Sequence, residues 1–265
     1  KLELPLDAHR KLIDHCKQKN IVFLSTPYDF KSVDMLLELD VPMFKIASTD
    51  CTNIPFIEYV AKTGKPIIIS TGLSTFREAQ DAVEACRRVG NTKIIIMQCT
   101  SNYPASMESA NIRVISTYRD KLDVQVGYSD HTNGELCAIL AVGQGAALFE
   151  HHFTKDKNLP GPDQKASANP EELKRYIKVI SQAHIALGDG IKRITLEEKS
   201  TKSRMQKSLT STRNIKSGEI INREDIKIRR PATGIAPKHL AQVIGKKASK
   251  NIKADVPITK NSVVF

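Results

Sequence analysis

The chain has 265 residues, with 40 lysines and arginines against 29 aspartates and glutamates, so its formal net charge is +11. This length suffices for one to two domains with their own cores, and the apolar runs are too short for a membrane span. The five cysteines form no CxxC pair, which argues against a disulfide framework or a structural zinc site and predicts a soluble, cytoplasmic protein.

Charge divides the chain into two parts. Residues 1–189 carry 22 basic and 23 acidic side chains, whereas residues 190–265 carry 18 and 6. We therefore predict one domain over residues 1–190, a linker over 191–205 and a small domain over 206–265. The basic tail has three open interpretations: a solvated face, a nucleic-acid-binding surface, or a surface that faces a phosphorylated substrate or a partner subunit.

Short apolar, β-branched runs alternate with helical patterns along the first part. Helical spacing is clear over Phe76–Val89, and Asp7, Ser74 and Asn169 stand where helix N-caps are expected. Because parallel strands need crossover helices, this alternation predicts a parallel sheet. The six predicted strands are Ile21–Leu24, Met43–Ala47, Pro66–Ile69, Lys93–Met97, Val124–Gly127 and Ala147–Phe149.

All six predicted strands end in polar or reactive side chains. An open α/β sheet concentrates its site at one switch point, whereas a (β/α)8 TIM barrel builds its site on the carboxyl ends of many strands. We therefore expect a TIM barrel. Six strands are two short of eight, and the chain begins at Lys1 inside a predicted helix, so we expect the first two strands to be missing.

Two histidines are candidates for metal ligands. Alternate residues of a strand share a face, so His131 points with Ser129 and His152 points with Glu150. Two imidazoles at the mouth of a barrel suit a catalytic divalent transition metal, although hydrogen-bonded structural histidines explain the spacing equally well. Asp130 and His151 lie on the opposite face, and His151 is expected to be structural or to support the groups that face the site.

Lys45 lies within a predicted strand among apolar neighbours, where an ammonium needs a partner. It can form a Schiff base or bind a phosphate or carboxylate as a fixed cation. Hydroxyl groups at the ends of the surrounding strands favour the anion. These hydroxyls belong to Thr26, Ser48, Ser70, Ser101 and Ser129.

Two further segments are distinctive. The stiff loop Leu159–Asp163 presents Asp163, which can accept hydrogen bonds from substrate hydroxyls or stabilise the turn. In the tail, Asn214–Ile226 is repeated as Asn251–Val263, which predicts a β-rich module of two related halves. Gly218 and Asp255 occupy the same turn position, where a positive φ is expected.

Seven ordered motifs resemble the sialic acid synthase family. They are FLSTPYD (23–29), FKIAS (44–48), KPIIISTG (65–72), QCTSNYP (98–104), GYSDHT (127–132), EHHFT (150–154) and GPDQKAS (161–167). The tail motif RRPATGIAP (229–237) is similar to the antifreeze-like SAF domain of that family. The resemblance covers essentially the whole chain.

The resemblance implies a transferase that condenses phosphoenolpyruvate with an N-acetylated amino sugar aldehyde, foremost N-acetylmannosamine, giving N-acetylneuraminate and phosphate. A divalent metal, Mn²⁺ or Mg²⁺, polarises the aldehyde oxygen. The family's metal histidines fall on His131 and His152, and Glu150 lies near the metal. Its phosphoenolpyruvate contacts fall on Thr26, Lys45, Ser48, Ser70, Ser101 and Ser129, with Lys45 as an electrostatic anchor.

The family's sugar contacts fall on Asp50, Tyr103 and Asp163, and on Arg230 from the SAF domain of a second subunit. The resemblance thus implies a domain-swapped homodimer whose basic tail closes over an anionic site, with no nucleic acid or membrane as partner.

Two departures leave alternatives open. Some members have Glu at the position of Asp50 and Asn at that of Ser101, so a legionaminic or pseudaminic acid synthase, acting on a diacetamido-dideoxy hexose, is the second candidate. Nothing in the chain matches a glutamate and a lysine on the family's first two strands, in line with the expected truncation. A Schiff-base aldolase using Lys45 and a polyanion-binding module are further alternatives.

Overall fold

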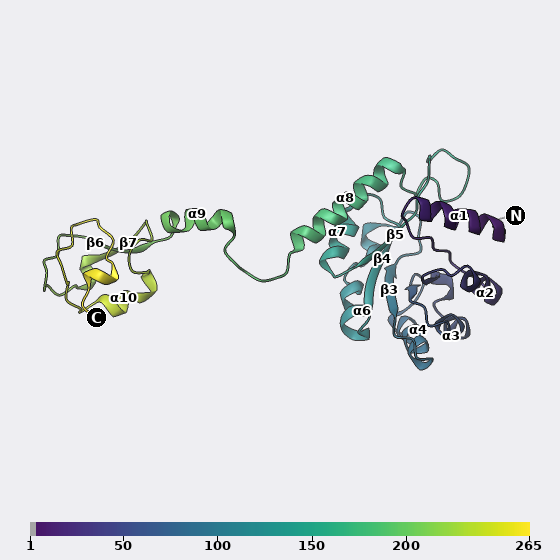
Figure 1. Cartoon of the computed structure of the whole chain (residues 1–265), viewed down its shortest axis with the longest axis horizontal. Coiled ribbons are helices and arrows are strands. Elements are labelled where there is room, and N and C mark those ends of the chain that lie inside the picture. The colour runs from purple at the N-terminus through teal and green to yellow at the C-terminus, as the bar shows by residue number, and fades with distance from the viewer. Residues whose placement is uncertain (1–3) are drawn as a thin grey trace. The chain divides into compact units, whose positions relative to one another are not determined.

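The computed structural model describes residues 4–265, which form two compact units. One unit ends at Asp189 and the other begins at Gly190 (Figure 1). Each unit is described by itself. Within the described residues, no helix is long and apolar enough to cross a membrane.

The first unit is an α/β structure built on a five-stranded, curled parallel sheet of order β1-β2-β3-β4-β5. Apolar, β-branched residues dominate its central strands, which are covered and therefore buried on both faces. The strands are β1 (Phe44–Ile46), β2 (Ile67–Ser70), β3 (Ile94–Cys99), β4 (Gln125–Asp130) and β5 (Leu148–His151). Five of the six predicted strands are confirmed.

The predicted strand Ile21–Leu24 is wrong. In the described chain this segment joins no sheet, and Ile21 and Val22 are 61% and 67% exposed. The apolar burial that would hold a strand in register is therefore missing there.

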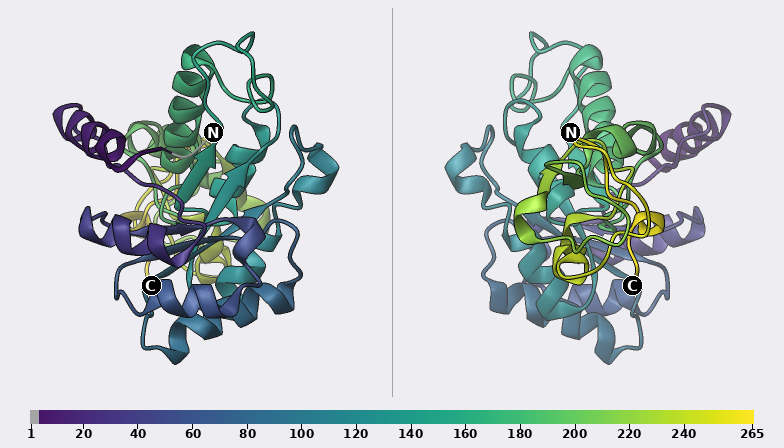
Figure 2. Two further views of the ribbon diagram at one scale, coloured as in Figure 1. Left: turned by 90° about the vertical axis from the view of Figure 1, so that its right-hand side faces the viewer. Right: turned by 90° about the vertical axis from the view of Figure 1, so that its left-hand side faces the viewer.

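Helices lie along the outer side of the sheet (Figure 2). Alternate strand residues such as Phe44, Ile67 and Ile96 pack into the core formed with these helices, so the residues between them face inward. The helices are α1 (Leu6–Gln18), α2 (Phe30–Glu38), α3 (Ile54–Ala61), α4 (Phe76–Arg88), α5 (Met107–Ala110), α6 (Val114–Leu122), α7 (Leu136–Gly143) and α8 (Pro170–Leu187), with a 3₁₀ turn η1 at Ser48–Asp50.

One of the three predicted N-caps is confirmed. Asn169 caps α8 in a reciprocal capping box with Glu172. The other two predictions are wrong by one or two residues. Thr75 rather than Ser74 caps α4, because its hydroxyl accepts the Glu78 N–H, and Pro5 rather than Asp7 precedes α1.

The second unit holds the short helix α9 (Leu196–Met205), within the range predicted as a linker, and an antiparallel pair, β6 (Ser208–Ser211) and β7 (Ile226–Arg229). Turns and short helices complete the unit around a separate apolar core. They are η2 (Arg223–Asp225), η3 (Pro237–His239), α10 (Leu240–Val243) and η4 (Lys260–Ser262).

The sequence repeat of the tail forms two matching halves. The Asn214 amide oxygen accepts the Ala254 N–H at 2.8 Å, and the Asn251 amide oxygen accepts the Ser217 N–H at 2.9 Å. Gly218 and Asp255 both have positive φ, at 82° and 62°, as predicted. The two halves therefore cap each other's turns.

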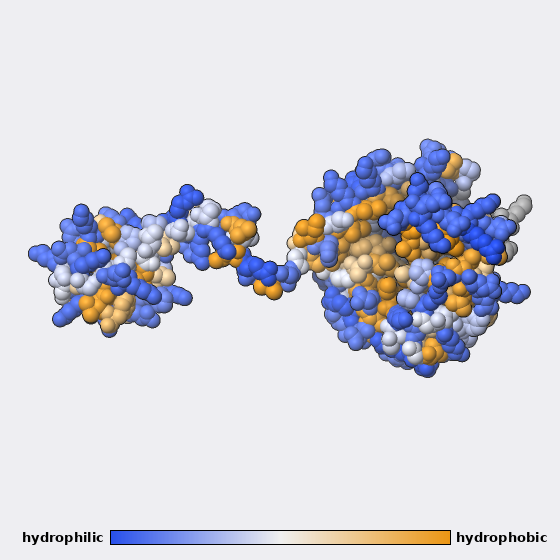
Figure 3. Space-filling model, viewed as in Figure 1, coloured by the Kyte–Doolittle hydropathy of each residue, from blue (hydrophilic) through white to orange (hydrophobic). Residues whose placement is uncertain are grey.

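Large apolar side chains remain exposed along α8 (Figure 3). Ile177 is 56% exposed, Ile185 78% and Leu187 54%. Exposed apolar groups gathered on one element are unusual on a monomer surface and are typical of contact surfaces.

The second unit should lose stability in acid. Burial raises the pKa of Asp225, but hydrogen bonds from Arg213 and from the Asn222 N–H outweigh burial and hold that pKa below its usual range. A lowered carboxylate pKa stabilises the fold above the unfolded-state pKa of about 3.9, and this stability is lost as pH falls through the folded pKa. We expect the methyl NMR signals of Ile221 and Ile258 to report unfolding at lower urea at pH 3 than at pH 6. Arg213→Met should shrink that difference, and an unchanged difference would contradict the assignment.

Candidate active site

A cavity of about 590 Å³ opens at the carboxyl ends of the strands, where the sequence predicted the site. Eleven predicted residues line it, brought together from the five strand ends and from two coil segments. They are Thr26, Lys45, Ser48, Ser70, Ser101, Tyr103, Ser129, His131, Glu150, His152 and Asp163.

The floor of the cavity carries a nearly buried cation. Lys45 is 9% exposed, and its Nζ lies 3.2 Å from Glu150 Oε2. The other carboxylate oxygen of Glu150 accepts a hydrogen bond from the Ser129 hydroxyl at 2.8 Å. Glu150 is thus the counter-charge of Lys45 in this cavity.

Ser70 adds an unmet hydrogen-bonding group beside this pair. The residue is 2% exposed, and its Oγ has no hydrogen-bond partner among residues 4–265. A buried hydroxyl without a partner costs free energy, so such a group is a mark of a site that a ligand completes. Ser48 differs, because its Oγ accepts the Gly72 N–H at 3.0 Å.

The two predicted histidines meet at one side of the cavity. Their ring centroids are 5.0 Å apart, and the Tyr103 ring lies 4.3 Å from His131 and 5.1 Å from His152. His131 Nδ1 lies 2.8 Å from the Thr100 carbonyl oxygen, and His152 Nδ1 lies 3.9 Å from Asp163 Oδ2. Both rings thus direct Nδ1 at protein acceptors.

This arrangement fits a metal only with ligands from outside the chain. The Thr100 carbonyl oxygen at Nδ1 of His131 fixes the tautomer that leaves Nε2 of that ring free to coordinate, as in many metal-binding histidines, whereas Asp163 Oδ2 is beyond hydrogen-bond distance of His152 Nδ1. Burial and the neighbouring His131 lower the pKa of His152, so its ring is neutral near pH 7, the form that binds metals. No group of three or more His, Cys, Asp or Glu suited to a metal occurs among the described residues, so water and substrate would supply the other ligands.

Five residues of the lining escaped prediction, namely Tyr28, Ala47, Thr49, Leu73 and Cys99. Cys99, the last residue of β3, lies 3.8 Å from His131 Nδ1 through its Sγ, while Tyr28 and Leu73 stand at the exposed rim. Burial raises the pKa of the Cys99 thiol, but hydrogen bonds with His131 and Ser48 outweigh burial and lower it overall. The alternation along β3 places Cys99 on the same face as Met97, which was the available signal.

Two predicted sugar contacts are not in the cavity lining. Asp50 lies in η1, and its carboxylate accepts a hydrogen bond from the Asn53 side chain at 3.0 Å. Arg230 belongs to the second unit, directly after β7. Their roles stay predictions.

The opposite face of β4 and β5 is structural, as the alternation predicted. Asp130 is fully buried and accepts hydrogen bonds from the Thr132 N–H, the Thr132 hydroxyl and, at 3.0 Å, the Tyr176 hydroxyl. The His151 ring lies 4.8 Å from that of Tyr176 and lines a second cavity of about 280 Å³. These contacts tie the end of β4 to α8.

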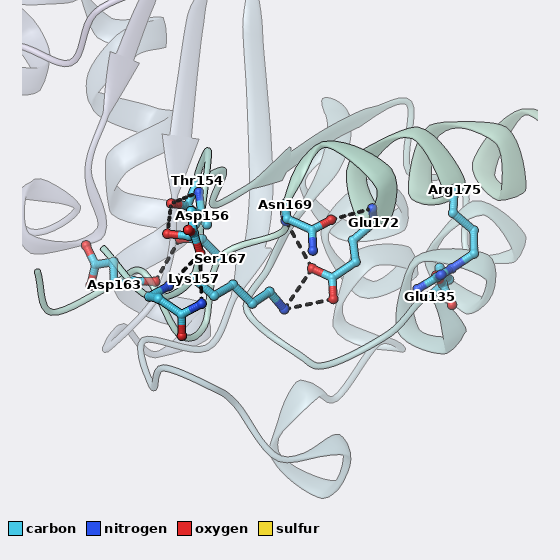
Figure 4. A network of polar contacts seen from close by, with 10 residues as sticks. Glu135, Thr154, Asp156, Lys157, Asp163, Ser167, Asn169, Glu172 and Arg175 are labelled. Carbon is cyan, nitrogen blue, oxygen red and sulfur yellow. Dashed lines mark hydrogen bonds and ion pairs between the residues drawn. The ribbon is translucent and has the colours of Figure 1, made fainter. Parts of the chain in front are cut away.

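The loop between β5 and α8 carries Asp163 to the first cavity (Figure 4). The Ser167 hydroxyl donates to the Asp163 carbonyl oxygen at 2.7 Å, and the Thr154 hydroxyl donates to the Asp156 carbonyl oxygen at 3.0 Å. Lys157 Nζ donates to Glu172 Oε1 at 2.9 Å, which fastens the loop to the first turn of α8. The loop is therefore held at both ends.

A parallel α/β sheet carries a nearly buried lysine, clustered hydroxyls and two imidazoles at its carboxyl edge, an arrangement typical of enzyme active sites. The NeuB family model matches residues 1–192, and the SAF domain model matches residues 206–264. The chain belongs to the NeuB family and carries a SAF domain. It is an enzyme of the transferase class, a phosphoenolpyruvate-dependent synthase that forms a carbon–carbon bond.

Three similar proteins show the range of the family. N,N'-diacetyllegionaminic acid synthase of Campylobacter jejuni is 42% identical over 257 residues, covering 96% of this chain and 77% of that enzyme. Pseudaminic acid synthase of Helicobacter pylori is 35% identical, covering 99% and 77%. The crystal structure of N-acetylneuraminic acid synthetase from Leptospira borgpetersenii, in complex with citrate, matches with a TM-score of 0.71 at 33% identity, covering 75% of this chain and 69% of that one.

The Tyr176–Asp130 bond should stabilise the first unit. Tyr176→Phe removes one hydrogen bond to a buried carboxylate, so we expect a loss of about 1 kcal/mol in the free energy of unfolding, measured by urea denaturation. The matched control is Tyr59→Phe, whose hydroxyl bonds the exposed Asp34 and should matter less. Equal losses in the two variants would contradict the role of burial.

Proposed function

We propose that the protein condenses phosphoenolpyruvate with the open-chain aldehyde of an N-acylated amino hexose and water, giving a nine-carbon sugar acid and phosphate. The observation that carries this proposal is the nearly buried Lys45 beside the unpartnered Ser70 hydroxyl, on the same cavity wall as two imidazoles. Lys45 and Ser70 offer a place for an anion, and the two imidazoles, through a metal, offer a place for a carbonyl oxygen.

Phosphoenolpyruvate supplies hydrogen-bond acceptors for the donors at the Lys45 end of the cavity. Its phosphate and carboxylate oxygens can accept from the Lys45 ammonium and from the Ser70, Ser101 and Thr26 hydroxyls. Charge-assisted hydrogen bonds in a nearly buried site are stronger than in water, which supports binding of a multiply charged anion. Glu150 pairs with Lys45 in this structure. When the anion binds Lys45 in its place, the Glu150 carboxylate is free to turn toward the histidines.

The reaction balances with this arrangement. C3 of phosphoenolpyruvate forms a bond to the aldehyde carbon, and water oxygen adds to C2. One water proton passes through Glu150 to the former aldehyde oxygen, which becomes a hydroxyl. The bond from C2 to the phosphate oxygen then breaks, C2 becomes a ketone, and phosphate leaves with the second water proton. The family's divalent metal, held by His131 and His152, would supply Lewis-acid polarisation of the aldehyde oxygen. Glu150, Tyr103 and Asp163 all line the cavity, which supports Glu150 as the carrier of that proton and Tyr103 and Asp163 as sugar contacts.

The acceptor sugar is proposed as a diacetamido-dideoxy hexose, with N-acetylmannosamine second. The 42% identity to a diacetyllegionaminic acid synthase, with most of both chains covered, supports the first sugar. The exposed Tyr28 and Leu73 at the cavity rim add apolar surface suited to acyl and deoxy methyl groups.

The remaining expectations belong to the same proposal. A (β/α)8 barrel is supported by the curled parallel sheet with sites on every strand end. The exposed apolar residues around the end of α8 support a homodimer, in which Arg230 of one subunit would serve the cavity of the other. The five cysteines are all free, which supports a cytoplasmic location.

The assay that tests the function is phosphate release from phosphoenolpyruvate, run with each sugar in turn. We expect release with Mn²⁺, faster with the diacetamido sugar, and no release after EDTA treatment until metal is restored. His131→Ala and His152→Ala should each remove the metal response. Release that persists in EDTA, with both histidines replaced, would contradict the proposed chemistry.

Lys45→Met separates the proposal from a Schiff-base aldolase. Loss of the preorganised cation should lower kcat/KM for phosphoenolpyruvate by about 10²–10³-fold. Borohydride reduction of wild-type protein with pyruvate should leave the mass of the protein unchanged, because Lys45 acts as a cation. An adduct on Lys45 would favour the aldolase instead.

A further inference from the structure

We infer that Gly72 is a positioning residue of the cavity, because the space left by its missing side chain keeps the Ser101 hydroxyl aimed at the bound anion and Ser48 in its place beside it. The inference rests on the proposed function, which assigns the Ser101 hydroxyl to phosphoenolpyruvate. It adds a residue that touches no substrate itself.

The geometry around Gly72 is tight on the side of the cavity. A Cβ atom built on Gly72 would overlap Ser101 Oγ, and it would lie 2.8 Å from Ser48 Oγ and 3.2 Å from Cys99 Sγ. All three side chains line the cavity. Cys99 and Ser101 come from the end of β3 and the coil after it, and Ser48 opens η1, so the Gly72 Cα lies where these two segments meet the end of β2.

The glycine is explained by space rather than by backbone freedom. Gly72 is not among the glycines with positive φ, so an alanine meets no backbone strain there. Its neighbour Leu73 does have a positive φ, of 64°, and tolerates it as a leucine. What the surroundings of position 72 require is therefore the absence of a Cβ atom.

The backbone at this position cannot withdraw from an added methyl group. Thr71 is anchored twice to the Met97 carbonyl oxygen, through its N–H at 3.2 Å and its hydroxyl at 2.8 Å. Tyr118, which is 3% exposed, donates to the Thr71 hydroxyl at 3.1 Å from behind. The Gly72 N–H itself donates to Ser48 Oγ.

An alanine at position 72 must therefore displace side chains rather than backbone. Ser101 lies in the coil after β3, and rotation about χ1 moves its hydroxyl to another staggered position at little cost. That rotation turns the hydroxyl out of the cavity. Ser48 must also shift by a few tenths of an ångström.

The test is a double-mutant cycle on the full chain. Gly72→Ala should raise the KM for phosphoenolpyruvate by about 10-fold or more, because misplacing a binding group by about 1 Å has effects of that order. Ser101→Ala removes the displaced oxygen, so Gly72→Ala should change KM less than about threefold in that background. Gly143→Ala is the matched control, since no atom lies within 4 Å of a Cβ built there. An unchanged KM in Gly72→Ala, or the same effect in both backgrounds, would overturn the inference.

Two structural readouts are independent of activity. A crystal structure of Gly72→Ala should show Ser101 in a different χ1 rotamer with residues 71–73 unmoved, and a shifted backbone with Ser101 in place would overturn the inference. If Gly72→Ala alone unfolds, the double variant with Ser101→Ala should fold. A wild-type protein inactive with both sugars contradicts the proposed function, while the Ser101 rotamer still decides the role of Gly72.

Discussion

The ion pair between Lys45 and Glu150 is the interaction on which the site depends. A lysine that is 9% exposed within a strand needs a counter-charge, and Glu150 supplies it at 3.2 Å from β5, at the far edge of the sheet order from β1. The contact joins the two edge strands of the curled sheet and puts a cation where the proposed function needs one. The same cavity is lined by Ser70, whose hydroxyl has no partner among the described residues, and by the two histidines, whose rings form a cluster with that of Tyr103.

Much of this arrangement could be predicted from the sequence because strands alternate. The two-residue period separates Ser129, His131, Glu150 and His152 from Asp130 and His151, and the structure keeps the two sets on opposite faces. Charge likewise separates a balanced first unit from a basic second one, and the internal repeat of the tail appears as two halves that cap each other. Periodicity and turn residues act locally, so a single sequence carries them.

The predictions failed where tertiary contacts decide. Ile21–Leu24 has the composition of a strand, but pairing needs a buried face that this segment lacks. Asp50 lies outside the cavity lining, where the turn η1 brings its carboxylate to Asn53, and its predicted contact with the sugar stays a prediction. Leu73 and Gly72 lie beyond the end of β2, where the alternation stops and only the packing of neighbouring segments sets direction. Their contributions therefore needed the structure.

The most direct test of the proposed anion site is a crystal structure of the protein soaked with phosphoenolpyruvate. We expect the ligand in the cavity at the strand ends, with phosphate or carboxylate oxygens within hydrogen-bond distance of Lys45 Nζ and Ser70 Oγ, and with Glu150 moved away from Lys45. Phosphoenolpyruvate bound elsewhere, or a Lys45–Glu150 pair that stays intact beside the bound ligand, would contradict the central claim.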